Sequence, residues 1–166
     1  MIVDGNQVSP SNSFSFNDTQ EHEIFMLLDM PEYLNSLNSM FRGINSMISI
    51  AFTTYFNTSN IINMGSMFIF CSSLISINLS NFDPSNVQDM ANMFQGCSSL
   101  TSINLSNFNT SKVNQMAAMF ADCSSLKSID LSNFNTSNIY YMSSMFFNSF
   151  LLKSINLPIV LILQEC

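Results

Sequence analysis

Three cysteines with identical spacing are the residues of this 166-residue chain that first suggest chemistry. Cys71, Cys97 and Cys123 lie 26 positions apart, so a fold that stacks 26-residue units places them near one another, because stacked strands are about 4.8 Å apart. Such thiols suit a metal ion or a disulfide. Each one follows a Met-Phe stripe without a neighbouring histidine, however, and a buried free cysteine packs as a small apolar group. We therefore expect core packing and no metal.

The remaining chemistry-bearing residues do not combine into a catalytic set. His22 is the single histidine, so no Ser-His or Cys-His arrangement includes a second one. The carboxylates Asp83, Asp89, Asp122 and Asp130 occupy different places in their repeats, which argues against a paired acid-base site or a calcium ladder. The thirteen methionines recur at fixed positions, which favours core filling. The sequence predicts a non-enzyme without a cofactor.

Composition excludes several partner classes. Four Lys+Arg against eleven Asp+Glu give a formal charge of -7, and nucleic acids and anionic membranes both require clustered basic residues. The N-terminal residues lack the apolar run of a secretory signal, so none is expected. The apolar stretch LPIVLILQEC from Leu157 is too short to span a bilayer, so membrane insertion is not expected either. Oligomeric state stays open.

The elements that position these residues follow from an internal repeat. The motif MFQGCSSLTSINLSNF recurs with changes, and Met67, Met93, Met119 and Met145 mark its 26-residue step. A degenerate first copy starts near residue 31, which makes about five units. A fixed period of this length is the signature of a solenoid. We assign residues 31–157 to the solenoid, residues 1–30 to an N-terminal segment with a capping helix, and residues 158–166 to a C-terminal cap.

Each unit reads as one helix followed by one strand. Val87, Met90, Met93, Phe94 and Cys97 share one helical face. The period then changes to alternation, since inward Ile103 and Leu105 lie between outward polar residues, as in a strand. Candidate helix N-caps are Ser85, Asn86, Ser111 and Ser137. The sequence therefore predicts a right-handed α/β solenoid of helix-strand units with a parallel sheet on one face.

The repeat resembles the BspA-like leucine-rich repeats, and more closely their Met-Phe variant, which is common in surface lipoproteins of mycoplasmas and in protist surface proteins. The resemblance rests on MFQGCSSLTSINLSNF and covers roughly residues 31–157, with Ser149 in the cysteine place of the last unit. It implies an extracellular or cell-surface location and adhesion to host proteins or other cells.

The outward strand positions are the candidate binding surface. They form three rows of small polar groups, which are Ser76, Ser102, Ser128 and Ser154; Asn78, Asn104, Asp130 and Asn156; and Ser80, Ser106 and Ser132. The rows lack the Tyr, Trp and Arg anchors of tight protein interfaces. They suit weak, multivalent contact with a repetitive protein or glycan. Strand propensity and stacking also explain them without a ligand.

Six Asn-x-Ser/Thr sequons bear on this surface. They begin at Asn17, Asn57, Asn78, Asn104, Asn109 and Asn135. Glycans on Asn78 and Asn104 would crowd the strand positions, so full glycosylation conflicts with a usable surface there.

The function predicted is a non-enzymatic binding or adhesion module. The alternatives are an intracellular scaffold whose sides and ends pair with other proteins, and a truncated repeat protein without a specific ligand.

Overall fold

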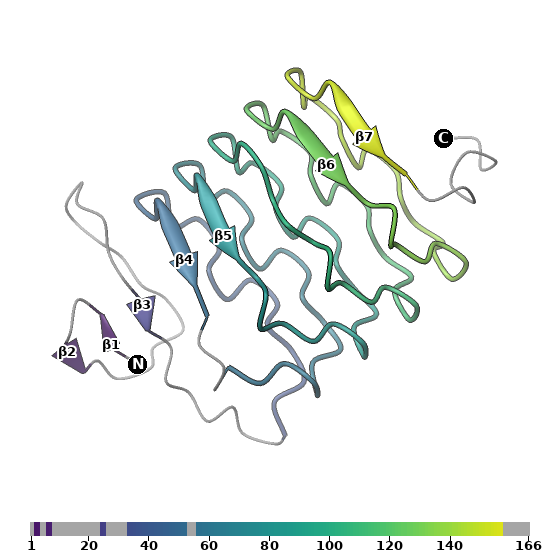
Figure 1. Cartoon of the computed structure of the whole chain (residues 1–166). Coiled ribbons are helices and arrows are strands. Elements are labelled where there is room, and N and C mark those ends of the chain that lie inside the picture. Colours follow the sequence, from purple (N-terminus) through teal and green to yellow (C-terminus); the bar gives the residue numbers. More distant parts are fainter. Residues whose placement is uncertain (1, 4–5, 8–23, 26–32, 53–55, 158–166) are drawn as a thin grey trace.

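Five coils of chain stack along one axis, with short strands on one side and a series of turns on the other (Figure 1). The computed structural model describes residues 2–3, 6–7, 24–25, 33–52 and 56–157. Neighbouring coils meet in parallel bridges at the same place of each repeat. The bridging residues are Ser36, Asn63, Asp89, Gln115 and Tyr141. These five positions confirm the predicted number of units.

The strand side carries two short parallel sheets. Strands β4 (Ser49–Ala51) and β5 (Ser76–Asn78) pair in one sheet, and β6 (Ser128–Asp130) and β7 (Ser154–Asn156) pair in the other. The third coil passes between them without a strand at residues 102–104. The predicted parallel sheet is therefore present in two pieces, and the predicted strand around Ile103 is absent.

A small antiparallel sheet precedes the solenoid. Its strands β1 (Ile2–Val3), β2 (Asn6–Gln7) and β3 (Ile24–Phe25) have the order β2-β1-β3, and β3 lies next to β4. The capping helix predicted within residues 1–30 does not include residues 24–25, because these pair with β1 as a strand. The remainder of that helix, His22 and the predicted cap at residues 158–166 lie outside the described residues.

The other side of the solenoid is a turn layer, which comprises residues 36–44, 63–71, 89–97, 115–123 and 141–149. The helices expected there are absent from the described residues. The described part of the chain also contains no helix that is long and apolar enough to cross a membrane. The backbone N–H groups instead donate to the next coil. Met90 donates to the carbonyl of Gln115 at 2.9 Å, and Phe94 donates to that of Met119 at 3.0 Å. A helix would have used these groups within its own segment.

Residues with left-handed backbone conformations also prevent a continuous helix in the turn layer. Asn92 has a φ of 58° and Gly96 a φ of 74°, and both follow the pattern of type II turns, in which the third residue has positive φ. The same places in other coils hold Ala118 (φ 55°) and Phe70 (φ 62°). The hydrogen bonds between coils therefore impose this geometry even on residues that disfavour it.

The core confirms which side chains point inward. Met90, Met93, Phe94 and Cys97 are all fully buried, as the predicted apolar face requires. Rings from successive coils stack nearly parallel, with centroids 5.3–5.8 Å apart, through Phe41, Phe68, Phe94, Phe120 and Phe146. Each ring therefore has its neighbours in adjacent coils, so the stability of a unit depends on the stack.

Candidate functional site

The strand face is defined here as the eleven outward polar residues of the second to fifth coils. All eleven are exposed, namely Ser76, Asn78, Ser80, Ser102, Asn104, Ser106, Ser128, Asp130, Ser132, Ser154 and Asn156. Two pairs lie directly opposite in β6 and β7, where Ser128 faces Ser154 and Asp130 faces Asn156. The predicted rows are therefore present as exposed rows, although Ser102 and Asn104 lie outside any strand.

Local hydrogen bonds hold the side chains of the middle row. The backbone N–H of Ser80 donates to Oδ1 of Asn78 at 3.0 Å, and that of Ser106 donates to Oδ1 of Asn104 at 3.0 Å. The N–H of Ser132 donates to Oδ1 of Asp130 at 2.9 Å. Because these contacts use one oxygen of each side chain, they fix the direction of the remaining amide or carboxylate group.

Asp130 supplies the negative charge of the row. Hydrogen bonds from the Ser132 side chain and backbone, with a further one from the Asn156 side chain, lower the pKa of the exposed Asp130 carboxyl. The group is therefore ionised at neutral pH and accepts hydrogen bonds. Along the row, two amides that carry N–H donors are followed by one carboxylate acceptor.

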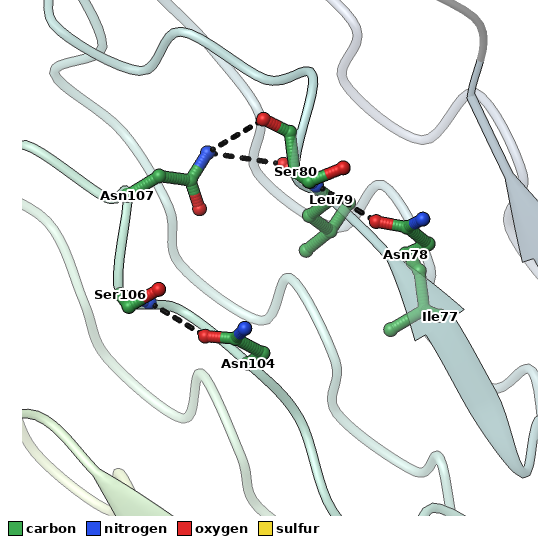
Figure 2. A pocket seen from close by; sticks show the side chains of 7 residues that line it. All are labelled: Ile77, Asn78, Leu79, Ser80, Asn104, Ser106 and Asn107. Carbon is green, nitrogen blue, oxygen red and sulfur yellow. Dashed lines mark hydrogen bonds between the residues drawn. The ribbon is translucent and has the colours of Figure 1, made fainter.

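A cleft of about 290 Å³ opens between β5 and the third coil (Figure 2). Four strand-face residues line it, two from each coil, and they are Asn78, Ser80, Asn104 and Ser106. Ile77, Leu79 and Asn107 complete the lining. The structure thus brings together part of the predicted surface in a concave site.

The cleft coincides with a break in the backbone ladder. In the fourth coil, the N–H of Leu131 donates to the carbonyl of Asn156 at 2.8 Å. The equivalent N–H groups of Leu79 and Leu105 have no such partner among the described residues. The side chain of Asn107 joins the two coils at this place, because its amide donates to the carbonyls of Leu79 at 3.1 Å and Phe82 at 2.9 Å.

Four contributors to this surface were missed from the sequence. Ser49 extends the serine row by one coil, since it faces Ser76 across the β4–β5 ladder. Its position 27 residues before Ser76 was a usable signal. Ile77 and Leu79 occupy the places of Ile103 and Leu105, which the sequence predicts to point inward, and Asn107 follows the predicted strand. Asn81, Asn107 and Asn133 recur at one period, which could have identified a bridging amide.

The three cysteines are positioned for packing. Their thiols donate to carbonyls of the preceding coil, with Cys71 bound to Phe41 at 3.0 Å and Cys97 bound to Phe68 at 3.2 Å. Ser149 takes the cysteine place in the last coil and donates to Phe120 at 2.8 Å. The thiols are free, and the described residues contain no group of three or more His, Cys, Asp or Glu that could hold a metal ion.

Burial makes these thiols poor nucleophiles. It raises the pKa of Cys71 to about 11 and that of Cys123 to about 12. The pKa of Cys97 is raised by burial as well, and then by the neighbouring thiols of Cys123 and Cys71. Since the thiolate is the reactive form, the native protein holds its described cysteines unreactive at neutral pH.

The chain is similar in sequence to one described protein family and in fold to solved leucine-rich repeat proteins. A family model described as "Mycoplasma protein of unknown function, DUF285" matches residues 34–157, which is more than half of the chain. No curated protein matches. The solved leucine-rich repeat protein of T. pallidum superposes with a TM-score of 0.58 at 18% identity, over 89% of this chain and 64% of that one. This likeness shows a leucine-rich-repeat fold.

A leucine-rich repeat protein from Bacteroides ovatus is also similar, at 19% identity and a TM-score of 0.30, over 75% of this chain and 41% of that one. This chain thus spans less than two thirds of the length of either solved protein.

Proposed function

Because the chain belongs to the DUF285 family, whose description assigns no function, we propose from its surface that it is a binding or adhesion module that contacts a partner through the strand face. The Met-Phe variant of the BspA-like repeats is the subgroup that we propose for it. The observation that carries the proposal is the set of eleven exposed, regularly spaced polar side chains, several of which are held in place by their own backbone.

Repetition and neutrality support this role. Ten of the eleven strand-face residues are Ser or Asn, and a solenoid presents such a set at a constant pitch. Each contact is individually weak, but a repetitive partner engages several at once and gains from the high effective concentration. A surface with one carboxylate and no aromatic or arginine anchor therefore suits an extended partner more than a compact one.

Lysines on the strand face test the proposed function. Biotinylated protein is applied to arrays of immobilised extracellular-matrix proteins and purified polysaccharides. We expect binding that falls at least about tenfold in the Asn78→Lys/Asn104→Lys double variant, because two desolvated amide contacts are replaced by bulky charges. The matched control is Gln88→Lys/Gln95→Lys, which adds the same charge away from the strand face. Equal loss in both variants, or loss in neither, contradicts the proposal.

A second candidate function is end-on association, because the last coil has no further coil stacked on it among the described residues. Tyr140 is 80% exposed, Phe147 61% and Phe150 79%, whereas Leu37 and Phe41 of the first coil are buried. The hydroxyl of Thr136 is buried without a hydrogen-bond partner in the described structure. In the preceding coil Thr110 has such a partner in Asn135.

The open end also presents a row of donors. The N–H groups of Met116, Ala118, Phe120 and Asp122 all donate to the last coil, whose own equivalents are at Met142, Ser144, Phe146 and Asn148. Within the described residues these four have no acceptor. The end therefore favours a protein segment that offers carbonyls in the register of one more coil, as expected for the scaffold alternative.

A synthetic peptide with the sequence of residues 111–136 tests end-on association. We expect it to bind the whole chain in a 1:1 ratio by calorimetry, because it carries the carbonyls that accept from the preceding coil in the native stack. The Phe147→Ser/Phe150→Ser variant removes exposed apolar contact and should bind the peptide about tenfold more weakly. The Asn78→Lys/Asn104→Lys variant is the control. Absence of binding to the unaltered chain excludes this candidate.

A further inference from the structure

The cleft between β5 and the third coil has an apolar floor and a polar rim. Leu79 is 1% exposed and Ile77 is partly buried, so their side chains lie beneath the surface of the sheet. Asn78, Ser80 and Asn104 are exposed around them (Figure 2). A ligand that fits must offer one apolar face and polar groups at its edges.

The rim is arranged to donate hydrogen bonds. The Oδ1 atoms of Asn78 and Asn104 are occupied by the N–H groups of Ser80 and Ser106. The Nδ2 groups of both asparagines and the hydroxyls of both serines have no hydrogen bond within the described part of the chain. Fixed donors of this kind lose little conformational entropy when a ligand binds.

The cleft does not admit another strand. The second and third coils are held together on the turn layer by N–H to carbonyl bonds, including Met64 to Asp89 at 2.9 Å and Phe70 to Gln95 at 2.7 Å. Strand addition requires a free sheet edge, and these bonds keep the two coils from separating by the width of a strand. A ligand must therefore enter from the strand face.

Resting on the proposed function, we propose that this cleft binds one pyranose ring of a neutral polysaccharide. A pyranose has an apolar C–H face, which packs on the exposed part of Ile77 above the buried Leu79. Its hydroxyl oxygens lie at the edges of the ring and accept from the amides of Asn78 and Asn104. The volume of the cleft, about 290 Å³, is just below the usual range of ligand sites, about 300–1,000 Å³, so the cleft suits a single ring.

Charge selects against acidic sugars. The seven residues that line the cleft include no lysine or arginine, and the next residue of the row is the ionised Asp130. Asp130 accepts hydrogen bonds from the hydroxyls of a neighbouring sugar ring, whereas it repels a uronic acid. The chain as a whole carries a formal charge of -7, which acts in the same direction.

Calorimetry of the whole chain tests this inference. The probes are hexasaccharides of β-1,4-linked glucose, N-acetylglucosamine, xylose and mannose, with hexagalacturonate as the acidic probe. We expect at least one neutral probe to bind with a dissociation constant below about 10 mM, and the acidic probe to bind at least about tenfold more weakly. Absence of binding by all neutral probes, or tighter binding of hexagalacturonate, overturns the inference.

A pair of isosteric variants localises the site. Asn104→Asp retains the acceptor for Ser106, as Asp130 does for Ser132, but loses the amide donor. It should weaken binding of the neutral probe about tenfold with unchanged melting temperature, whereas Asn109→Asp adds the same charge outside the cleft and should have no effect. Equal effects overturn the assignment. Strand-face-dependent binding to proteins alone would leave the proposed function standing and refute the sugar site.

Discussion

Between pH 8.5 and 11 we expect the free energy of unfolding to fall with a slope that steepens toward about 4 kcal/mol per pH unit, because three buried thiols resist ionisation in the native protein. An unfolded cysteine titrates near pH 8.5, whereas burial raises the pKa of Cys71 to about 11 and that of Cys123 to about 12. Unfolding then releases one proton from each of Cys71, Cys97 and Cys123. Their contribution is fully present below pH 8.5 and is lost as the pH approaches the native pKa values.

Urea denaturation at successive pH values measures this fall. The control is the triple variant Cys71→Ser/Cys97→Ser/Cys123→Ser, since Ser149 already makes the equivalent hydrogen bond to Phe120. Its stability should change much less over the same range, because a serine hydroxyl does not titrate there. A variant that loses stability as steeply as the unaltered chain would assign the alkaline transition to other groups.

The period and the inward face of the solenoid were predictable because they depend on which side chains are hydrophobic, and the sequence shows this directly. Met93, Phe94 and Cys97 recur at 26 residues and are all fully buried, whichever backbone carries them. Their spacing of one to three residues fits a helix and equally fits consecutive turns. The choice between the two depends on whether an N–H donates within its own segment or to the next coil, and that is a property of the stack.

Neighbouring repeats contain identical segments that differ in secondary structure, so local sequence alone does not predict where a strand forms. Residues 76–82 and 102–108 both read SINLSNF, yet the first segment contains β5 and the second contains no strand. The cleft of the candidate site lies between these two segments. Because their sequences are identical, the difference in strand formation depends on how each coil is placed against its two neighbours. The polar rows were therefore predictable, while the concave site within them was not.

The bridging asparagines unite fold and site, because the same amide closes the broken ladder and lines the cleft. Asn107 donates to Leu79 and Phe82, and Asn133 donates one coil further on to Leu105 and Ser106. These contacts join the coils where the sheet is interrupted, and Asn81 makes a similar contact with Phe52 where β4 and β5 are paired. The cleft can therefore stay open to a ligand while the coils on either side of it remain joined.

Replacing Asn107 by aspartate should lower the free energy of unfolding by about 2–3 kcal/mol. The change is isosteric, but it replaces an amide that donates to the carbonyls of Leu79, Ser80 and Phe82 by a carboxylate that donates nothing and is repelled by all three oxygens. Acidification that protonates the new carboxyl returns one donor, so the loss relative to the unaltered chain should shrink at low pH. Urea denaturation at pH 7 and at pH 3 measures both effects.

Asn109→Asp is the matched control for this substitution. It makes the same charge change two residues away, at the place where the preceding coil already has Asp83. The oxygen of Asp83 accepts from the N–H of Ser85 at 3.0 Å, as that of Asn109 does from Ser111 at 3.1 Å, so the control should alter stability by less than about 0.5 kcal/mol. Comparable losses in the two variants would show that added negative charge, and not the bridging amide, controls the stability of the stack.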